Sequence, residues 1–470
     1  MPKEHKTIFG TTEKSNFILN MTLDTMYKII RVMLVISMGL SVAAGGLWLF
    51  TGKLYAYMGL AMLTFSGFAC ALWFGISVWK SSTPFYKNIS YFMAIALAIL
   101  AIISTLLSYS KATSLFGNQG RFEGLLAIVS YIALFLFATM IGSALDAKKI
   151  IDVIIAVGLI NAVVAALQRF GVLYTPFKSL FSTMKENVFL PTGFVGSPIF
   201  LATLLVICLA LAMNGACFDA SLRRRIYYYV STGIFAAVLP LTHSLIAMLG
   251  AGLVLIITLG IVIVRAVKTK EKLEKNLFAN PTGKFILSAV ILMVFVAAVG
   301  WADKFSLLDR DIAWHDSFFY LFISGMLSNS YDGGLYETGW NIALDAISRH
   351  PLEGTGPDCL WAPQIIGQKY LDITVLANSL ERPYNDYLYV AATRGIPSLV
   401  IYLALIILSI KRAFGSFKAF VTSSENWYIP AMITAVIAYL VVIFFGVSTI
   451  YVAPYFWILL GIMNNKQIKN

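Results

Sequence analysis

Long apolar runs separated by short polar segments occupy most of this chain. Each run has about the 20 residues that a helix needs to cross ~30 Å of hydrocarbon. In lipid such a run must be helical, because every backbone N–H and C=O needs a partner within its own segment. The pattern therefore predicts an all-α, polytopic integral membrane protein. We expect twelve transmembrane helices, at residues 32–50, 55–79, 89–109, 124–143, 149–167, 198–216, 226–241, 244–264, 284–301, 387–410, 428–446 and 448–463.

Composition and charge narrow the class of protein. Hydrophobic residues make up 59% of the 470 and charged residues 12%, against roughly a quarter charged in soluble domains. The net charge of +12 lies in short basic clusters between the apolar runs. Such clusters are typical of topology signals and contacts with anionic lipids, so we expect membrane lipids and no nucleic acid as partners. Four cysteines are too few for a disulfide framework, and we expect no disulfide.

The distribution of lysine and arginine predicts the orientation. With the N-terminus inside the cell, the cytoplasmic segments hold 23 of the 35 basic residues. We therefore predict that both termini are cytoplasmic. The expected parts are a cytoplasmic segment at 1–31, nine transmembrane helices within 32–301, a large extracytoplasmic loop at 302–386, three further transmembrane helices within 387–463 and a cytoplasmic tail at 464–470.

The predicted loop at 302–386 is the long polar segment of the chain. It holds 12 of the 23 acidic residues but only five of the 35 lysines and arginines. Within it, Trp340, Leu344 and Ile347 repeat at helical spacing, which predicts a short helix from 336 to 348 that Pro351 ends. The loop is thus expected to contain short helices at the outer membrane surface.

Residues that could carry chemistry gather on this predicted outer face. The sequence has no zinc-type His/Cys cluster, Walker loop or Gly-x-Ser-x-Gly motif, which disfavours a classical hydrolase or an ATP-driven pump, and we expect no metal and no cofactor. Arg121 precedes the fourth expected helix, and a guanidinium suits a phosphate or diphosphate because its planar fork donates two parallel hydrogen bonds. Glu123 could pair with Arg121 or act as a base. Alternatively, Arg121 is an interfacial arginine that reaches the lipid headgroups.

Other polar residues lie at the mouths of the expected helices. Arg169 precedes a loop that ends in a Gly- and Pro-rich helix start, where exposed amides attract anions, although such punctuation is also ordinary. His243 lies in a tight turn and could serve as a base, as a phosphate donor or as a structural residue. The end of the large loop supplies Arg382, Tyr384, Asn385 and Asp386, with Arg394 further along, while His315, Arg349 and His350 lie earlier in the loop.

The order of these features resembles the O-antigen ligase / O-antigen polymerase superfamily of bacterial envelope proteins. The resemblance runs from about residue 90 to the C-terminus. The matching motifs are Arg121-Phe122-Glu123-Gly124-Leu125, Gly196-Ser197-Pro198, Thr242-His243-Ser244, Trp340, Pro351-Leu352-Glu353-Gly354-Thr355-Gly356-Pro357, Pro383-Tyr384-Asn385-Asp386-Tyr387-Leu388, Arg394-Gly395-Ile396 and Phe456-Trp457-Ile458-Leu459-Leu460-Gly461.

This resemblance implies an activity and a set of roles. Members transfer a glycan from an undecaprenyl-diphosphate carrier to a glycan, lipid or surface acceptor at the outer face of the cytoplasmic membrane, without a metal or a nucleotide sugar. Arginines would hold the diphosphate, and a base would activate the acceptor hydroxyl for inverting attack. The candidate catalytic residues are Glu123, His350, Tyr384 and Asp386; the candidate substrate-binding residues are Arg121, Arg169, His243, His315, Arg349, Arg382, Asn385 and Arg394.

The sequence departs from the family pattern at two positions. Ligase-like members commonly have a histidine, thought to be catalytic, where this chain has Tyr384, and an arginine where it has Leu245. A free tyrosine titrates near 10 and is a poor base at neutral pH. Another residue (His350, His315, Glu123 or Asp386) supplies the base, or the protein is a polymerase-type member that needs no such histidine, or its activity is reduced.

Two functions outside this class compete with a transferase. A lipid-linked-glycan flippase would also be a basic protein with many spans, but transporters usually show internal repeats and broken spans with charges near the midplane. This chain has its polar residues at one face and in one loop. A non-catalytic assembly factor of the envelope is indicated only by the missing histidine.

Overall fold

The described residues of the computed structural model fold into helices, with no strand among them. The structure describes residues 23–51, 56–81, 88–118, 121–169, 172–173, 191–242, 244–269, 280–304, 331–362, 382–446 and 448–465. The helices that coincide with the predicted apolar runs are α2 (Leu23–Thr51), α3 (Ala56–Ser81), α4 (Ile89–Leu107), α6 (Leu125–Ala138), α7 (Ala144–Arg169), α8 (Pro198–Phe218), α9 (Leu222–Leu241), α10 (Leu245–Thr269), α11 (Pro281–Lys304), α17 (Ile396–Thr422), α18 (Tyr428–Phe444) and α19 (Ala453–Met463).

Seven of the described helices are long and apolar enough to cross a membrane. The qualifying stretches are Gly59–Val78, Ile89–Leu107, Ala144–Arg169, Pro198–Phe218, Ile246–Thr269, Ile396–Thr422 and Ser424–Phe444, and three shorter apolar helices lie at Leu125–Ala138, Pro281–Val296 and Ala453–Met463. The chain is therefore a multi-pass membrane protein of helices, as predicted. The number of twelve crossings stays a prediction.

The run expected as one helix at 387–410 is divided in two. A short helix, α16 (Asp386–Arg394), ends at Gly395, and α17 begins directly after it. Gly395 has φ +83°, and a Cβ there would lie 2.0 Å from the carbonyl oxygen of Leu352. The backbone N–H of Ile396 donates to the carbonyl of Pro351 (2.8 Å). The expectation of one continuous helix was wrong, because the loop around Pro351 needs the space that only a glycine leaves.

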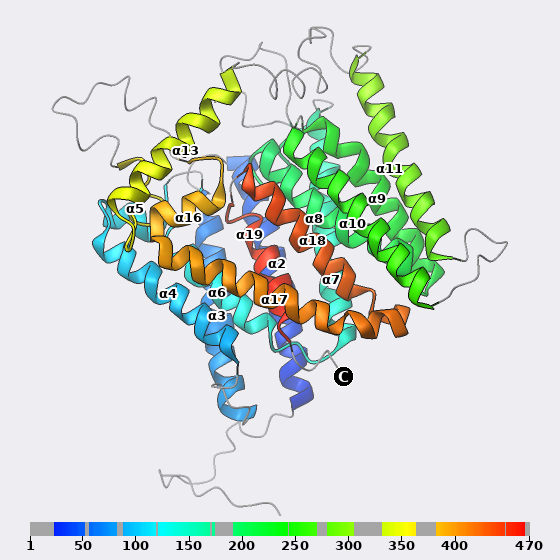
Figure 1. Ribbon diagram of the computed structural model, residues 1–470, viewed down its shortest axis with the longest axis horizontal. Helices are drawn as coiled ribbons and strands as arrows, with labels where there is room; N and C mark the ends of the chain where they lie inside the picture. Colours follow the sequence, from blue (N-terminus) through cyan, green and yellow to red (C-terminus); the bar gives the residue numbers. More distant parts are fainter. Residues whose placement is uncertain are drawn as a thin grey trace, which may run out of the picture.

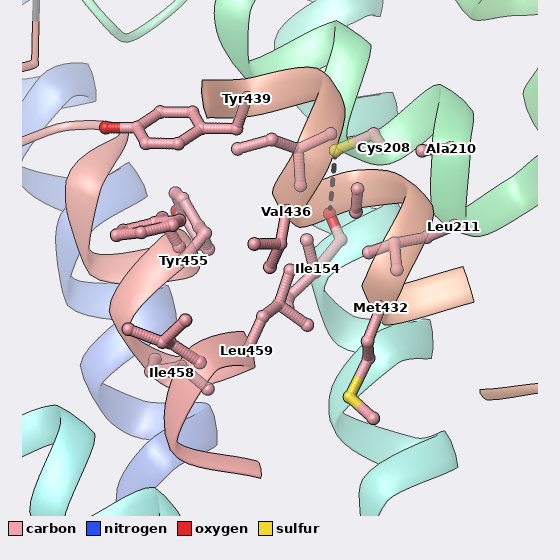
Figure 2. Close-up of a cluster of buried hydrophobic side chains, with 14 of the residues drawn as sticks. Ile154, Cys208, Ala210, Leu211, Met432, Val436, Tyr439, Tyr455, Ile458 and Leu459 are labelled. Carbon is pink, nitrogen blue, oxygen red and sulfur yellow. Dashed lines mark hydrogen bonds between the residues drawn. The ribbon is translucent and has the colours of Figure 1, made fainter. Parts of the chain in front are cut away.

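The helices pack around a core in which α8 is central and almost wholly buried. It contacts α7, α9, α10, α11 and α18, and α6 contacts α3 and α19. Figure 2 shows the apolar side chains of this core, with the thiol of Cys208 donating to the carbonyl of Ile154 (3.5 Å). Small residues permit the closest approaches: a Cβ on Gly461 of α19 would lie 2.4 Å from the carbonyl oxygen of Phe135 in α6. Such contacts are typical of helix packing in membranes.

Three short helices and a loop form a polar layer at one end of α4 and α17 (Figure 1). This layer consists of α5 (Lys111–Phe116), α13 (Tyr331–Arg349), α16 and the loop 350–362. The loop is fixed to α16 by backbone N–H groups of Thr355 and Gly356, which donate to Ala392 and Thr393 (both 2.9 Å). The hydroxyl of Ser104 in α4 also donates to the carbonyl of Thr393 (2.8 Å). The helix predicted at 336–348 is confirmed as α13, which ends before Pro351.

Candidate functional site

A strained turn before α6 separates Arg121 from Glu123. Phe122 between them has φ +54° and a fully buried ring. Gly117 lies against this turn, and a Cβ on it would lie 2.4 Å from the Phe122 backbone. A left-handed φ at a residue other than glycine costs on the order of 1–3 kcal/mol and persists where the surroundings enforce it. The described residues include only two further examples, Asp358 and Tyr384, and both belong to the segments described next.

Asp358 holds the Arg121 turn to the loop 350–362. One carboxylate oxygen lies 3.6 Å from Nη2 of Arg121 and accepts from the hydroxyl of Tyr389 (2.7 Å). The other oxygen accepts from the backbone N–H of Asn118 (2.6 Å). Burial raises the pKa of this carboxyl, but Arg121, Arg382 and the two hydrogen bonds outweigh it, so the pKa lies below its ordinary value. Asp358 is therefore an ionised anchor with both oxygens in use.

Arg382 is a buried cation, and two nitrogens of its guanidinium have no hydrogen-bond partner. Only 5% of the residue is exposed. Its Nη1 donates to the backbone carbonyl of Ser448 (2.5 Å), and its guanidinium carbon lies 5.4 Å from the centre of the Tyr389 ring. Its Nε and Nη2 are buried without a hydrogen-bond partner. Buried N–H groups are normally paired, so two charged donors are available here to an anion.

Asp386 lies beside this arginine at the start of α16. It is buried, and its Oδ1 accepts from the backbone N–H of Ser448 (3.3 Å). Burial raises the pKa of the Asp386 carboxyl, while the charges of Arg394 and Arg382 oppose that rise. The backbone of Ser448, between α18 and α19, thus contacts both Arg382 and Asp386. This loop fixes the end of the large loop against the helix bundle.

Glu123 is the third buried carboxylate. Its Oε1 accepts from the hydroxyl of Tyr131, nearly two helical turns into α6 (2.9 Å), and no other hydrogen bond joins it to the described residues. Burial raises the pKa of Glu123 to about 7, although the charge of Arg382 and the Tyr131 hydroxyl favour the ionised form. The negative charges of Asp386 and Asp358 add to the rise.

Tyr384 and Asn385 shape the backbone that carries Arg382 and Asp386. Tyr384 is half-buried and has φ +49°. Asn385 is the N-cap of α16, and its side-chain oxygen accepts from the backbone N–H groups of Tyr387 and Leu388 (3.0 Å each). The strained residue and the cap together set the direction in which α16 leaves the turn. The structure therefore gives Asn385 a capping role.

Comparison with known proteins indicates a family. Residues 230–403 match the model of the O-antigen ligase family. Over this span the chain is similar to that family. The match includes Asp358, Arg382 and Asp386. The fold brings these residues close to Arg121 and Glu123, which lie outside the matched span. A comparison with curated proteins gave no match.

Several predicted site residues lie apart from the cluster. Both ring nitrogens of His350 are engaged, Nδ1 with Glu353 (2.9 Å) and Nε2 with the hydroxyl of Tyr109 (2.8 Å). Arg349 is exposed and pairs with Asp345 (3.0 Å). Arg169 is buried at the end of α7, beside the Gln168 side chain that accepts from the backbone N–H groups of Thr192 and Gly193. His243 and His315 lie outside the described residues.

The structure adds residues that sequence reasoning missed. Asp358, Ser448, Tyr131 and Tyr389 each contact at least one of the charged residues. Asp358 directly follows the Gly354-Thr355-Gly356-Pro357 turn of the acidic segment, which was a usable signal. Within the described part of the chain, no three His, Cys, Asp or Glu side chains are grouped so that they could hold a metal ion.

Proposed function

We propose that this protein transfers a glycan from an undecaprenyl-diphosphate carrier to a glycan, lipid or surface acceptor. The transfer would take place at the outer face of the bacterial cytoplasmic membrane, with both termini in the cytoplasm. The observation that supports this best is Arg382, a buried arginine with two unused N–H donors beside a second arginine, Arg121. A diphosphate is the part of such a donor that a guanidinium recognises best.

The reaction needs positioning and charge stabilisation from the protein. The acceptor hydroxyl attacks the anomeric carbon, and the bond to the diphosphate oxygen breaks, so negative charge grows on the leaving diphosphate. Arg382 and Arg121 would stabilise that charge in a site with little water, where such interactions are strong. Asp358 lies 3.6 Å from Arg121, and the charges of Asp358 and Asp386 act on Arg382. A buried site of this kind supports either polymerisation or ligation, according to the acceptor it admits.

The test uses the purified full chain in detergent with a polyprenyl-diphosphate-linked oligosaccharide and an acceptor glycan, in EDTA and without nucleotide. We expect a longer glycan to form, and Arg382→Ala to lower the rate about 100-fold or more, as expected for a lost charge-stabilising donor. Arg382→Lys keeps the charge but loses the fork, so it should restore only part of the rate.

The matched control is Lys111→Ala, which removes an exposed cation of α5 in the same polar layer. Its rate should equal that of the unmodified protein, and thermal unfolding should show all three variants folded. A folded Arg382→Ala variant with full activity would contradict the assignment of the diphosphate site. No transfer by the unmodified protein from any such donor would contradict the proposed function itself.

A further inference from the structure

The proposed transfer requires a base, and Tyr384 stands where a histidine would be expected. Among the described residues, two buried carboxylates, Asp386 and Asp358, lie close enough to Glu123 for their charges to raise its pKa. The three carboxylates differ in how fully their oxygens are used. A base must offer a lone pair to the proton it removes, so this difference sets Asp358 apart from Glu123 and Asp386.

Asp358 is excluded by its contacts. Its two oxygens receive Arg121, the Tyr389 hydroxyl and the Asn118 amide. The same environment lowers the pKa of its carboxyl. A carboxylate with both oxygens engaged and a lowered pKa has a weak affinity for a proton.

Asp386 is an electrostatic partner of two arginines. The charges of Arg394 and Arg382 act on its carboxyl, and the backbone N–H of Ser448 donates to its Oδ1. Removing its charge would leave two buried or half-buried cations without their neighbour, which is the role of an electrostatic anchor. His350 is engaged by Glu353 and Tyr109 on both ring nitrogens, and its contacts include none of the charged residues of the cluster.

Glu123 and Asp386 each keep one carboxylate oxygen without a hydrogen bond from the described residues, and of the two only Glu123 shares a turn with Arg121. Tyr131 donates to Oε1, and Oε2 receives no hydrogen bond from the described residues. The strained turn at Phe122 fixes Glu123 next to the start of α6 and Arg121 two residues before Glu123. The site therefore presents an arginine fork and a carboxylate oxygen from one rigid turn, with a second arginine from α16's entry. This is the arrangement needed to hold a leaving diphosphate and an attacking hydroxyl together.

We propose that Glu123 is the general base of the transfer, with Tyr131 as its positioning residue. This rests on the proposed function. In the step, the acceptor O–H proton passes to Oε2 of Glu123, and the acceptor oxygen bonds to the anomeric carbon. The carbon–oxygen bond to the diphosphate breaks, and its electron pair stays on the departing polyprenyl diphosphate. The proton on Glu123 is then lost to water before the next cycle.

The groups that face Glu123 support this role. Arg382 and the Tyr131 hydroxyl favour its ionised form, whereas burial and two neighbouring carboxylates favour the protonated form. The balance leaves the carboxyl able to exchange a proton near neutral pH. The titratable and charged groups involved are Arg382, Asp386, Asp358, Tyr131 and Tyr439.

The decisive experiment compares Glu123→Gln with the unmodified protein. Glutamine keeps the shape and accepts from Tyr131, but it cannot take a proton, so transfer to a hydroxyl acceptor should fall about 100-fold or more. Sodium azide is then supplied as the acceptor, because an azide ion attacks without losing a proton. Glu123→Gln should form the inverted glycosyl azide at a rate close to that of the unmodified protein. Glu425→Gln, at an exposed carboxylate, is the matched control and should leave both rates unchanged.

The outcomes separate the alternatives. Loss of hydroxyl transfer with retained azide transfer supports Glu123 as the base. Loss of both reactions in a folded variant would show a structural or binding role and overturn the inference, although the proposed function would stand. Full hydroxyl transfer by Glu123→Gln, with loss in His315→Ala, would place the base on the 302–386 loop and also overturn it. An unmodified protein that consumes no lipid-linked donor would remove the proposed function and this inference together.

Discussion

At the scale of single residues, the charge balance around Glu123 predicts the pH dependence of transfer. Burial raises the pKa of Glu123 to about 7, and a base acts only when it is deprotonated. The ratio kcat/KM for the donor reports the free enzyme, so it should rise about tenfold per pH unit below 7 and level off above it. The profile of kcat should be displaced to higher pH, because the negative diphosphate in the site favours the protonated carboxyl.

The variant Tyr131→Phe tests whether Glu123 is the group that titrates. The Tyr131 hydroxyl donates to Glu123 and so favours its ionised form. Without it the pKa of Glu123 rises further, and the acid limb of kcat/KM should move to higher pH. The measurement is the rate from pH 5.5 to 9 with both proteins. An acid limb that stays in place in Tyr131→Phe would show that another group titrates.

The sequence predicted part of this site and missed the rest for a physical reason. Arg121, Glu123, Arg382 and Asp386 were found because charged residues next to apolar runs need an explanation. Asp358 was not singled out because its role as an anchor depends on Arg121, Tyr389 and Asn118, which only the fold brings near it. Ser448 acts through its backbone, which a residue type does not reveal.

At the scale of the helices, the apolar runs were predictable because the hydrocarbon core demands length and backbone satisfaction. The division of α16 from α17 was not, since the carbonyl of Leu352 that fills the space beside Gly395 belongs to a distant loop. The expected helix over 387–410 followed the apolar pattern, which continues across the break. A pattern of side chains cannot report a backbone contact.

Gly395→Ala tests the importance of this break. At φ +83° an alanine costs about 1–2 kcal/mol for its backbone conformation alone, and its Cβ would collide with the Leu352 carbonyl. We expect a lower unfolding temperature and a loss of transfer, because α16 carries Asp386 and Tyr389. The control is Gly415→Ala in α17, where a Cβ meets nothing within 4 Å and alanine is the better helix former. Equal unfolding temperatures for the two variants would contradict this account.

At the scale of the whole molecule, ion pairs join segments that are distant in the sequence. The cluster of Arg121, Asp358, Arg382 and Asp386 joins segments that were all expected outside. Arg31 pairs with Asp146, and Arg224 pairs with Asp152 and Asp219, among segments expected at the cytoplasmic side. Arg31 and Arg224 are themselves among the basic residues on which the predicted orientation rests, so the orientation stays a prediction.

Cysteine labelling tests that topology directly. The native cysteines are unpaired and buried, which should keep the background low in intact cells. Lys111→Cys places a thiol on α5 in the polar layer, and Glu425→Cys places one between α17 and α18, both at exposed positions. A maleimide that does not cross membranes should label Lys111→Cys in intact cells and Glu425→Cys only after permeabilisation. Because the charged cluster shares the side of α5, labelling at position 425 from outside would place the site in the cytoplasm, where a lipid carrier of surface glycan is not consumed.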